Sequence, residues 1–288
     1  MKKRVFFITV IVLISLASVA VYQFIQFDDG KLHIIFCDIG QGDSILIKTP
    51  GKKLILADGG PDRLTLDCLS RHLPFWEREL DLMLLSHPHA DHFVGFLYVL
   101  NRFTVLSFAT ENLSNKTGGF TELLRAIKEE HITVKHVVAG DQWKIADGVT
   151  ISIVGPTAEF LKRKDPDGII TDSAESASLA TLISYGEFSL LVTGDAPVDE
   201  LHEVGESIDA VDVLQIPHHG STTGLDARVL RDLSPQLAVI SVGENNYGHP
   251  TKKVLDMLTQ VSIPVKRTDQ EGDVEIVSDG EKWWVVYE

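Results

Sequence analysis

The protein has 288 residues, of which 44% are hydrophobic and 23% charged, and its formal net charge is -15. This is an ordinary globular composition, with enough apolar residues for a sizeable core in one large domain or two small ones. Because proteins that bind polyanions over a broad surface are usually basic, the charge excludes such a surface and leaves only local or metal-mediated contacts with nucleic acid.

The first 27 residues differ from the rest of the chain. Three basic residues in "MKKR" precede a run over 5–27 that carries no charge, and a run of this length can cross a bilayer as a helix. Basic residues before the span favour a cytoplasmic N-terminus and a remainder outside the cytoplasmic membrane. We therefore expect an N-terminal membrane anchor or signal peptide over 1–27 and one domain over 28–288.

Cleavage of the apolar run is the alternative to anchoring. Ser18 and Ala20 are small residues with the spacing that signal peptidase prefers. The run continues apolar past Ala20 as far as Phe27, which favours an uncleaved anchor. Both alternatives, membrane-anchored or secreted, place the domain outside the cytoplasmic membrane.

Apolar runs in the remainder predict short, mostly buried strands. In chain order they cover 32–37, 44–49, 53–57, 81–86, 133–138, 149–154, 210–216, 237–242, 265–268, 273–278 and 282–287, with a hairpin over 178–193. Helical patterns lie between them over 61–73, 93–103, 118–131, 225–232 and 251–261. This order predicts sheets whose outer faces are covered by helices. The segment 155–178 has no clear periodicity and is expected to form a surface loop or lid.

The chain has two cysteines, Cys37 in a predicted strand and Cys68 in a predicted helix. Export would permit a disulfide between them. Two buried thiols are nevertheless the favoured expectation, because free cysteines are among the most buried residues.

Four side chains of metal-ligand type follow the strand 81–86. They are His87, His89, Asp91 and His92, in the stretch "SHPHADH". Imidazole nitrogen and carboxylate oxygen are ligands of zinc, and of manganese or iron where carboxylates contribute. A tight loop can aim His87 and His89 at one point and the other two side chains at a second point nearby.

Two further stretches place ligand-type residues just beyond a strand. Asp195 follows one strand of the hairpin, and His218 and His219 follow the strand 210–216. Because sites in open α/β sheets form at the carboxyl ends of the strands, one edge of the fold is expected to gather all three groups.

These motifs resemble the metallo-β-lactamase superfamily. The stretches "DIGQGDSILI", "LADGG", "LSHPHADHFVG", "LLVTGDA", "IPHHGS" and "SVGENNYGHP" resemble one branch of it, the C-terminal hydrolase domain of the DNA-uptake (competence) protein ComEC and its stand-alone relatives. The resemblance covers residues 32–288. It implies an α/β fold, a four-layer αββα sandwich that one N-terminal hydrophobic helix precedes, with metals at one edge of two packed sheets.

The resemblance also implies a ligand set. His87 and His89 would bind a first metal, the second would be bound by Asp91, His92 and His219, and Asp195 would bridge the two. His219 is preferred to His218 because His219-Gly220-Ser221 fits the last ligand motif of the superfamily. Asp58 matches an aspartate that braces the histidine-rich loop, and Gly194 and Ser221 are expected to support the site.

The sequence departs from the family pattern at two places. Many members have a further histidine where this chain has Gly155-Pro156-Thr157. The ComEC branch also lacks that ligand, so the first metal is expected to be more open or weakly held. The branch often has asparagines before its "SLV", where this chain has Glu175 to Leu179, so a substrate contact is expected to be altered or lost.

The expected cofactors are two divalent metal ions, zinc or manganese, and no organic cofactor. Two such ions about 3.5–4 Å apart lower the pKa of a bridging water to give hydroxide near neutral pH. Asp91 or Asp195 would orient that hydroxide, and His218 or His249 would protonate the leaving group. His249 is alternatively a phosphate contact or a structural loop residue.

The predicted function is that of an exported phosphodiesterase, a nuclease acting on DNA. One alternative is a hydrolase of a small surface phosphodiester such as a phosphorylcholine ester. Another is a non-enzymatic, membrane-tethered module that keeps metals for stability. A flavin-linked diiron oxidase is disfavoured. Such proteins have the pattern His-x-Glu at this point of the motif, whereas position 89 of this chain is histidine. The expected partners are the membrane, through the N-terminal helix, and the phosphodiester substrate.

Overall fold

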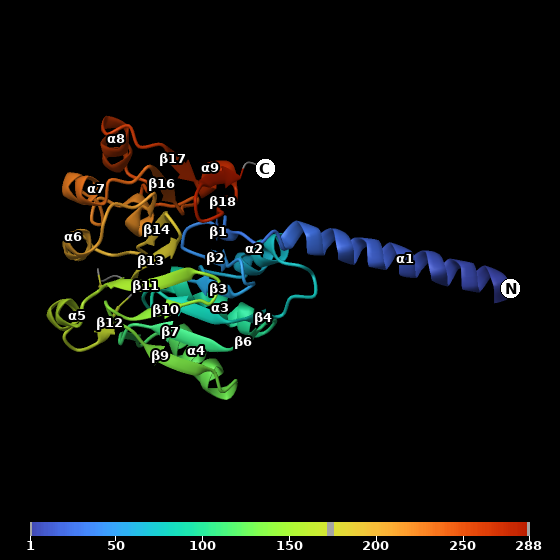
Figure 1. The fold of residues 1–288 in the computed structure, drawn as a ribbon. Helices are drawn as coiled ribbons and strands as arrows, with labels where there is room; N and C mark the ends of the chain where they lie inside the picture. The colour runs from blue at the N-terminus through green and yellow to red at the C-terminus, as the bar shows by residue number, and fades with distance from the viewer. Residues whose placement is uncertain (1, 172–175, 287–288) are drawn as a thin grey trace.

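The computed structural model describes residues 2–171 and 176–286. Two sheets pack face to face, helices cover their outer faces, and one long helix projects from the domain (Figure 1). The predicted four-layer αββα arrangement after an N-terminal apolar helix is therefore confirmed. The helices are α1 (Lys2–Phe27), α2 (Leu64–His72), α3 (Ala90–Leu100), α4 (Gly118–Glu129), α5 (Ala158–Lys164), α6 (Val198–Ser207), the 3₁₀ helix η1 (Pro217–Gly220), α7 (Ala227–Leu233), α8 (Lys252–Gln260) and α9 (Thr268–Glu271).

The first sheet has eight strands. In spatial order they are β19 (Trp283–Val286), β18 (Val274–Ser278), β1 (Leu32–Phe36), β2 (Ile45–Lys48), β3 (Leu54–Ala57), β5 (Leu82–Leu85), β7 (Ser107–Thr110) and β9 (Thr133–His136). Neighbours are antiparallel from β19 to β3 and parallel from β3 to β9. The strands β3 and β5 therefore end at the same edge of the sheet.

The second sheet has seven strands. They are β10 (Gln142–Lys144), β11 (Val149–Gly155), β13 (Ala180–Tyr185), β14 (Phe188–Val192), β15 (Val213–Gln215), β16 (Leu237–Ile240) and β17 (Val265–Arg267). The last four are parallel, so β14, β15 and β16 end together. Two short ribbons pair β8 (Ser114–Asn115) with β12 (Ile169–Ile170), and β4 (Glu79–Leu80) with β6 (Thr104–Val105).

Both faces of the first sheet are buried. Ile34 and Ile55 belong to the core between the two sheets, whereas the adjacent residues Ile35 and Leu56 belong to the core beneath α2, α3 and α4. A third core lies between the second sheet and α6, α7 and α8. Because the side chains of a strand alternate between two faces, a strand covered on both sides is apolar throughout. This explains the continuous apolar runs in the sequence.

Several elements differ from the prediction. The strand β7 and the helix α6 were not predicted. The helix α3 begins at Ala90 rather than after His92, because its first turn carries ligand-type side chains instead of the apolar residues that mark the rest of it.

The expectation that residues 155–178 form a surface loop or lid was wrong in part, because they include α5 and β12. Thr157 accepts a hydrogen bond from the backbone of Phe160 at the start of α5, which satisfies a free amide of the first turn. Phe160 and Ile170 are buried in a small apolar cluster with Leu113. Residues 172–175, which include Glu175 of the altered stretch, lie outside the described part of the chain.

The two cysteines form a disulfide, so the expectation of two buried thiols was wrong. Cys37 follows β1 and Cys68 lies on the buried face of α2, and their Cα atoms are 5.8 Å apart. A disulfide requires such a distance, which sequence spacing does not reveal. The helix α2 is thus covalently joined to the sheet beneath it.

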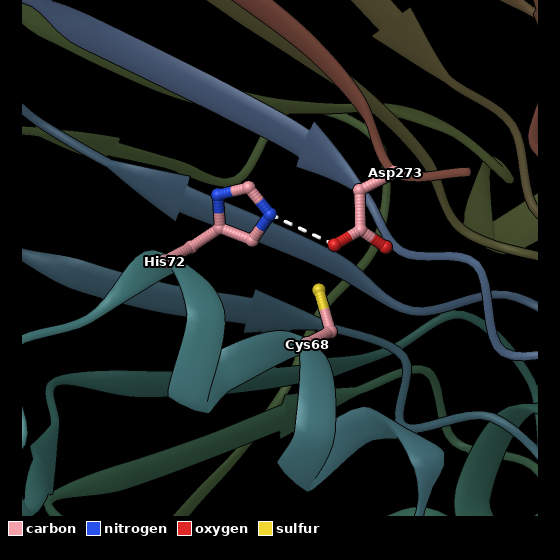
Figure 2. A group of neighbouring side chains, drawn as sticks. All are labelled: Cys68, His72 and Asp273. Atoms are coloured by element: carbon pink, nitrogen blue, oxygen red, sulfur yellow. Dashed lines mark hydrogen bonds and ion pairs between the residues drawn. The ribbon is translucent and has the colours of Figure 1, made fainter. Parts of the chain in front are cut away.

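An ionic contact beside the disulfide also fastens α2 to the sheet. Asp273 accepts hydrogen bonds from His72 and from Arg71 on α2, and from the backbone of Asp38. Figure 2 shows Cys68, His72 and Asp273 facing one another. These three residues have the composition of a metal site. Because Cys68 is oxidised and both Asp273 oxygens already accept hydrogen bonds, the group is structural.

We predict that replacement of both cysteines, Cys37→Ala with Cys68→Ala, lowers the free energy of unfolding by about 3–4 kcal/mol, because the closed loop spans 31 residues. Urea unfolding with the metal content held constant measures the loss, and Ser70→Ala on the exposed face of α2 is the control. Alkylation of the denatured, unreduced protein should modify neither cysteine. Uptake of two alkyl groups before reduction would contradict the disulfide.

Candidate metal centre

The ligand loop begins where β5 ends, and Asp58 at the end of the neighbouring strand β3 holds it. Asp58 accepts hydrogen bonds from the backbone and the hydroxyl of Ser86, both at 2.7 Å, and from Nδ1 of His92 at 2.8 Å. Because the carboxylate accepts from Nδ1, the other ring nitrogen of His92, Nε2, is free to bind a ligand. These contacts fix the start of the loop, and the role of Asp58 in supporting a metal site stays a prediction.

Asp195 reaches the same edge from the second sheet. It follows β14 through Thr193 and Gly194, whose amides both donate to the side chain of Gln215. Gly194 has a positive φ of 50°, and a Cβ there would clash with Ser86 and Ser178. Only glycine therefore lets this turn approach the ligand loop closely.

His218 and His219 lie in η1, just beyond β15. Both adopt left-handed backbone conformations, with φ of 51° and 53°, a region that non-glycine residues seldom occupy. Nδ1 of His219 donates to the carbonyl of Ser241 at 3.0 Å, so its Nε2 faces the other ligands. The backbone of Ser221 donates to His218, and its hydroxyl lies 3.1 Å from that of Thr223. The turn is thereby fixed on both sides.

The six predicted ligands gather into two groups that share Asp195. Ligand atoms of His87, His89 and Asp195 lie within 4.8 Å of one another, as do those of Asp91, His92 and His219. One Asp195 oxygen, Oδ1, lies 3.4 Å from Nε2 of His92 and 3.6 Å from Nε2 of His219. The other, Oδ2, lies 3.8 Å from Nε2 of His87. Asp195 thus presents one oxygen to each group.

The distances within the second group fit a metal ion rather than direct hydrogen bonds. Nε2 of His219 lies 3.5 Å from Asp91, and Nε2 of His92 lies 3.9 Å from Asp91. Such separations are at or beyond the limit of a hydrogen bond. Two ligands at about 2.0–2.2 Å from one tetrahedral ion lie about 3.3–3.6 Å apart. The 3.5 Å between His219 and Asp91 matches this spacing, and the 3.9 Å between His92 and Asp91 is somewhat longer.

Unsatisfied polar atoms at this point also fit a cation. Among the described residues, four buried atoms at the centre have no hydrogen-bond partner: Nε2 of His87, His92 and His219, and Oδ1 of Asp195. A buried polar atom without a partner costs about 1–3 kcal/mol, so four at one point require an explanation. A divalent cation with nitrogen and oxygen ligands supplies the missing partner for all of them.

The carboxylates of the centre set the charge of its histidines. Burial lowers the pKa of His92, but Asp195 and Asp91 outweigh it and raise that pKa well above its usual range. The same balance raises the pKa of His219 to about 9. Burial and the charge of His92 hold the pKa of His87 far below its usual value. A cation that binds Nε2 of His92 or His219 therefore displaces a proton.

His218 and His249 lie at the outer side of the centre. Nε2 of His218 is 3.6 Å from Oδ2 of Asp195, and 32% of its side chain is exposed. The rings of His218 and His249 are 5.6 Å apart. Burial and the charge of His218 lower the pKa of His249. The imidazole of His218 thus lies beside the carboxylate that the two groups share, and His249 lies next to His218.

Asp43 lies directly behind the second group and was not among the predicted site residues. It is 1% exposed, and neither of its oxygens has a hydrogen-bond partner in the described part of the chain. These oxygens lie 3.8 Å from Nδ1 of His92 and 3.9 Å from Nδ1 of His219. Burial raises the pKa of Asp43. The motif "GQGDS" carries this aspartate, but the sequence alone does not show which strand end it meets.

Ser178 is a second residue that the sequence did not reveal. Its hydroxyl accepts from the backbone of Asp195 at 3.1 Å and lies 3.4 Å from Nδ1 of His87. Its own backbone donates to the buried carboxylate of Glu200 on α6, a group whose pKa burial raises well above its usual range. The stretch in which the family's asparagines are missing therefore supports two of the ligands.

The family model of the metallo-beta-lactamase superfamily matches residues 37–244, and the chain therefore belongs to this superfamily. The geometry of the site agrees with that membership, since the superfamily fold binds divalent metals, often two. Proteins of this fold are typically metal-dependent hydrolases.

Curated relatives place the chain near the competence proteins. It is 30% identical to ComE operon protein 3 of Bacillus subtilis over 86% of this chain and 33% of the relative. It is 26% identical to Recombination protein 2 of Haemophilus influenzae, over 91% of this chain and 31% of that protein. Both are competence proteins of the ComEC family, as the sequence motifs predicted. The chain spans about a third of the length of these relatives.

Solved structures support the fold. The metallo-beta-lactamase fold protein YhfI from Bacillus subtilis superposes with a TM-score of 0.58 at 14% identity, over 85% of this chain and 99% of that one. CmlA, a diiron beta-hydroxylase from Streptomyces venezuelae, superposes with a TM-score of 0.55 at 16% identity, over 86% of this chain and 54% of that one. At 14% and 16% sequence identity, both likenesses support the fold alone, because one fold can host many different reactions.

We predict that Asp43→Asn weakens divalent-metal binding by about 10–100-fold, because the charge behind His92 and His219 increases their basicity as ligands. Titration of the metal-free protein with zinc or manganese against a competing chelator measures the effect. Asp38→Asn is the matched control, since it removes the same charge from an exposed position of the same loop. Equal metal affinity of wild type and Asp43→Asn would show that the carboxylate plays no part in metal binding.

Proposed function

We propose that the protein is a membrane-anchored phosphodiesterase that uses two divalent cations, zinc or manganese, and acts on DNA. The observation that carries the proposal is the pair of ligand groups that share Asp195. His87 and His89 with Asp195 would hold the first cation. Asp91, His92 and His219, again with Asp195, would hold the second.

The site has the components that hydrolysis of a phosphodiester requires. When bound, two cations lower the pKa of a coordinated water and polarise a phosphate oxygen. Asp91, which is partly exposed, accepts a hydrogen bond from the attacking water and orients it. His218, exposed beside Asp195, donates a proton to the leaving oxygen. The ring of His249 lies 5.6 Å from that of His218, so His249 is the second candidate for this proton transfer.

The substrate class follows from charge and from the relatives. The chain carries a formal net charge of -15, so a polyanion is held at the cations rather than over a basic surface. Relatives that are competence proteins support DNA as the phosphodiester. A small surface phosphodiester such as a phosphorylcholine ester is the second candidate, because an open first metal position also admits a compact substrate.

The proposed location is outside the cytoplasmic membrane, with α1 as an uncleaved anchor. The helix is long and apolar enough to cross a membrane, and three basic residues precede its apolar run. The disulfide between Cys37 and Cys68 gives independent support, since disulfides persist in oxidising compartments and are rare in the cytoplasm. The phosphodiesterase would therefore meet DNA or surface polymers outside the cell membrane.

Replacement of His218 and replacement of His219 are expected to have different effects on metal content and rate. His219→Ala should lose metal from the second position and activity with it. His218→Ala should keep both metals and lose about 10²–10⁴-fold in rate on DNA. Its loss should be small on a nitrophenyl phosphodiester, because nitrophenolate leaves without protonation. Metal content by elemental analysis and turnover on both substrates measure these effects.

The control for these variants is His202→Ala, since His202 pairs with Asp226 on the surface away from the centre. It should keep the metals and the rate. Loss of metal by His218→Ala would make His218 a ligand, which its 3.6 Å distance from Asp195 permits. If the wild type with both metals bound cleaves neither DNA nor the nitrophenyl substrate, the phosphodiesterase assignment fails.

A further inference from the structure

The C-terminal end of α1 is fastened to the domain. Asp28, directly after the helix, pairs with Lys52 at 2.5 Å. The ammonium of Lys48 on β2 lies 5.4 Å from the centre of the Phe27 ring. Further up the helix, the side chain of Gln23 accepts a hydrogen bond of 3.1 Å from the backbone of Phe75. Gln23 lies four residues before the end of α1 at Phe27, so the turn that contains Phe75 lies beside the last turn of the helix.

Two aromatic side chains protrude from that turn. Phe75 is 61% exposed and Trp76 is 43% exposed, and their rings meet edge to face at 5.0 Å. Exposed aromatic rings of this kind are enriched at the surface of a bilayer, where an apolar ring contacts lipid. Arg78 and Arg102 line the same hollow as Phe75, together with the acidic Glu77. Basic side chains thus outnumber acidic ones there, which suits anionic headgroups.

The candidate metal centre lies at the other end of the strands. The strand β1 starts soon after α1, and β3 and β5 run in the same direction because β1 and β3 both pair antiparallel with β2. The register aligns Phe36 at the far end of β1 with Ala57 and Leu84. Asp58 and the ligand loop follow directly. In Figure 1, α1 joins the domain beside α2, the helix that precedes the aromatic turn.

We propose that the turn over 74–77 rests in the interface of the bilayer that α1 crosses, with Phe75 and Trp76 inserted among the lipids. The near ends of β1 and β3 then face the membrane, and the metal centre points away from it. A polymer in solution reaches the centre without approaching the lipid surface. The inference rests on the proposed anchoring by α1 but not on the proposed reaction.

Quenching of tryptophan fluorescence by lipid tests this contact. The full chain is reconstituted into vesicles of phosphatidylcholine and phosphatidylglycerol, with and without bromine on the acyl chains. Brominated lipid should quench part of the wild-type emission, and Trp76→Phe should remove the quenched part. Trp143→Phe, on β10 of the second sheet, should retain it. Quenching that persists in Trp76→Phe, or is absent from the wild type, overturns the proposal.

Spin labels give an independent reading that does not need an aromatic side chain. Because the native cysteines are paired, Phe75→Cys and Tyr247→Cys each offer one new thiol for a nitroxide. The label at 75 should be relaxed more by oxygen, which concentrates in lipid, than by a water-soluble nickel chelate. The label at 247, on a side chain 76% exposed beside His249, should show the reverse. Equal nickel access at both positions overturns the docking.

Extraction with alkaline carbonate distinguishes anchoring by α1 from lipid contact by the turn over 74–77. If the chain stays in the vesicles but Trp76 is not quenched and position 75 is accessible to nickel, anchoring by α1 is supported and the lipid contact of the turn is overturned. If carbonate releases the chain from the vesicles, both the anchoring and the lipid contact are overturned. A chain that resists extraction and shows lipid contact at 75 and 76 supports both.

Discussion

The candidate centre depends on one carboxylate, that of Asp195, whose buried Oδ1 has no hydrogen-bond partner among the described residues. One of its oxygens faces His92 and His219 at 3.4 and 3.6 Å, and the other faces His87 at 3.8 Å. Burying a charged group without a partner is costly, and the buried imidazole nitrogens around it also lack hydrogen bonds within the described residues. Such a cluster is stable only with positive charge at its centre, supplied by protons on His92 and His219 or by cations that replace them.

The fold brings this cluster together through the direction of its strands. In each sheet the strands that end at the site are parallel to one another, so Asp58 and the ligand loop come from the first sheet, and Asp195 and the histidine pair from the second. Apolar cores on both faces of each sheet hold the strand ends rigid. The contacts of Asp58, Ser178 and Gln215 then orient the ligands, which is the arrangement a preorganised metal site requires.

The sequence predicts those parts of the structure that local patterns encode. The ligand-type residues at 87–92 are contiguous and follow a recognisable strand, and the motifs around Asp195 and His219 have the same relation to their strands. Three features depend on contacts between segments distant in the chain, so local patterns do not predict them. They are the disulfide, the position of Asp43 and the contacts of Ser178 with the ligands. The helix α5 was missed because its seven residues, about two turns, are too few to show a period.

The most direct test of the account is anomalous diffraction from crystals of the protein loaded with zinc or manganese, measured on both sides of the metal absorption edge. The account predicts two anomalous peaks, one beside each oxygen of Asp195. The first should be bonded to His87 and His89, and the second to Nε2 of His92 and His219. A single peak, or peaks that do not contact Asp195, would contradict the shared carboxylate on which the proposed reaction depends.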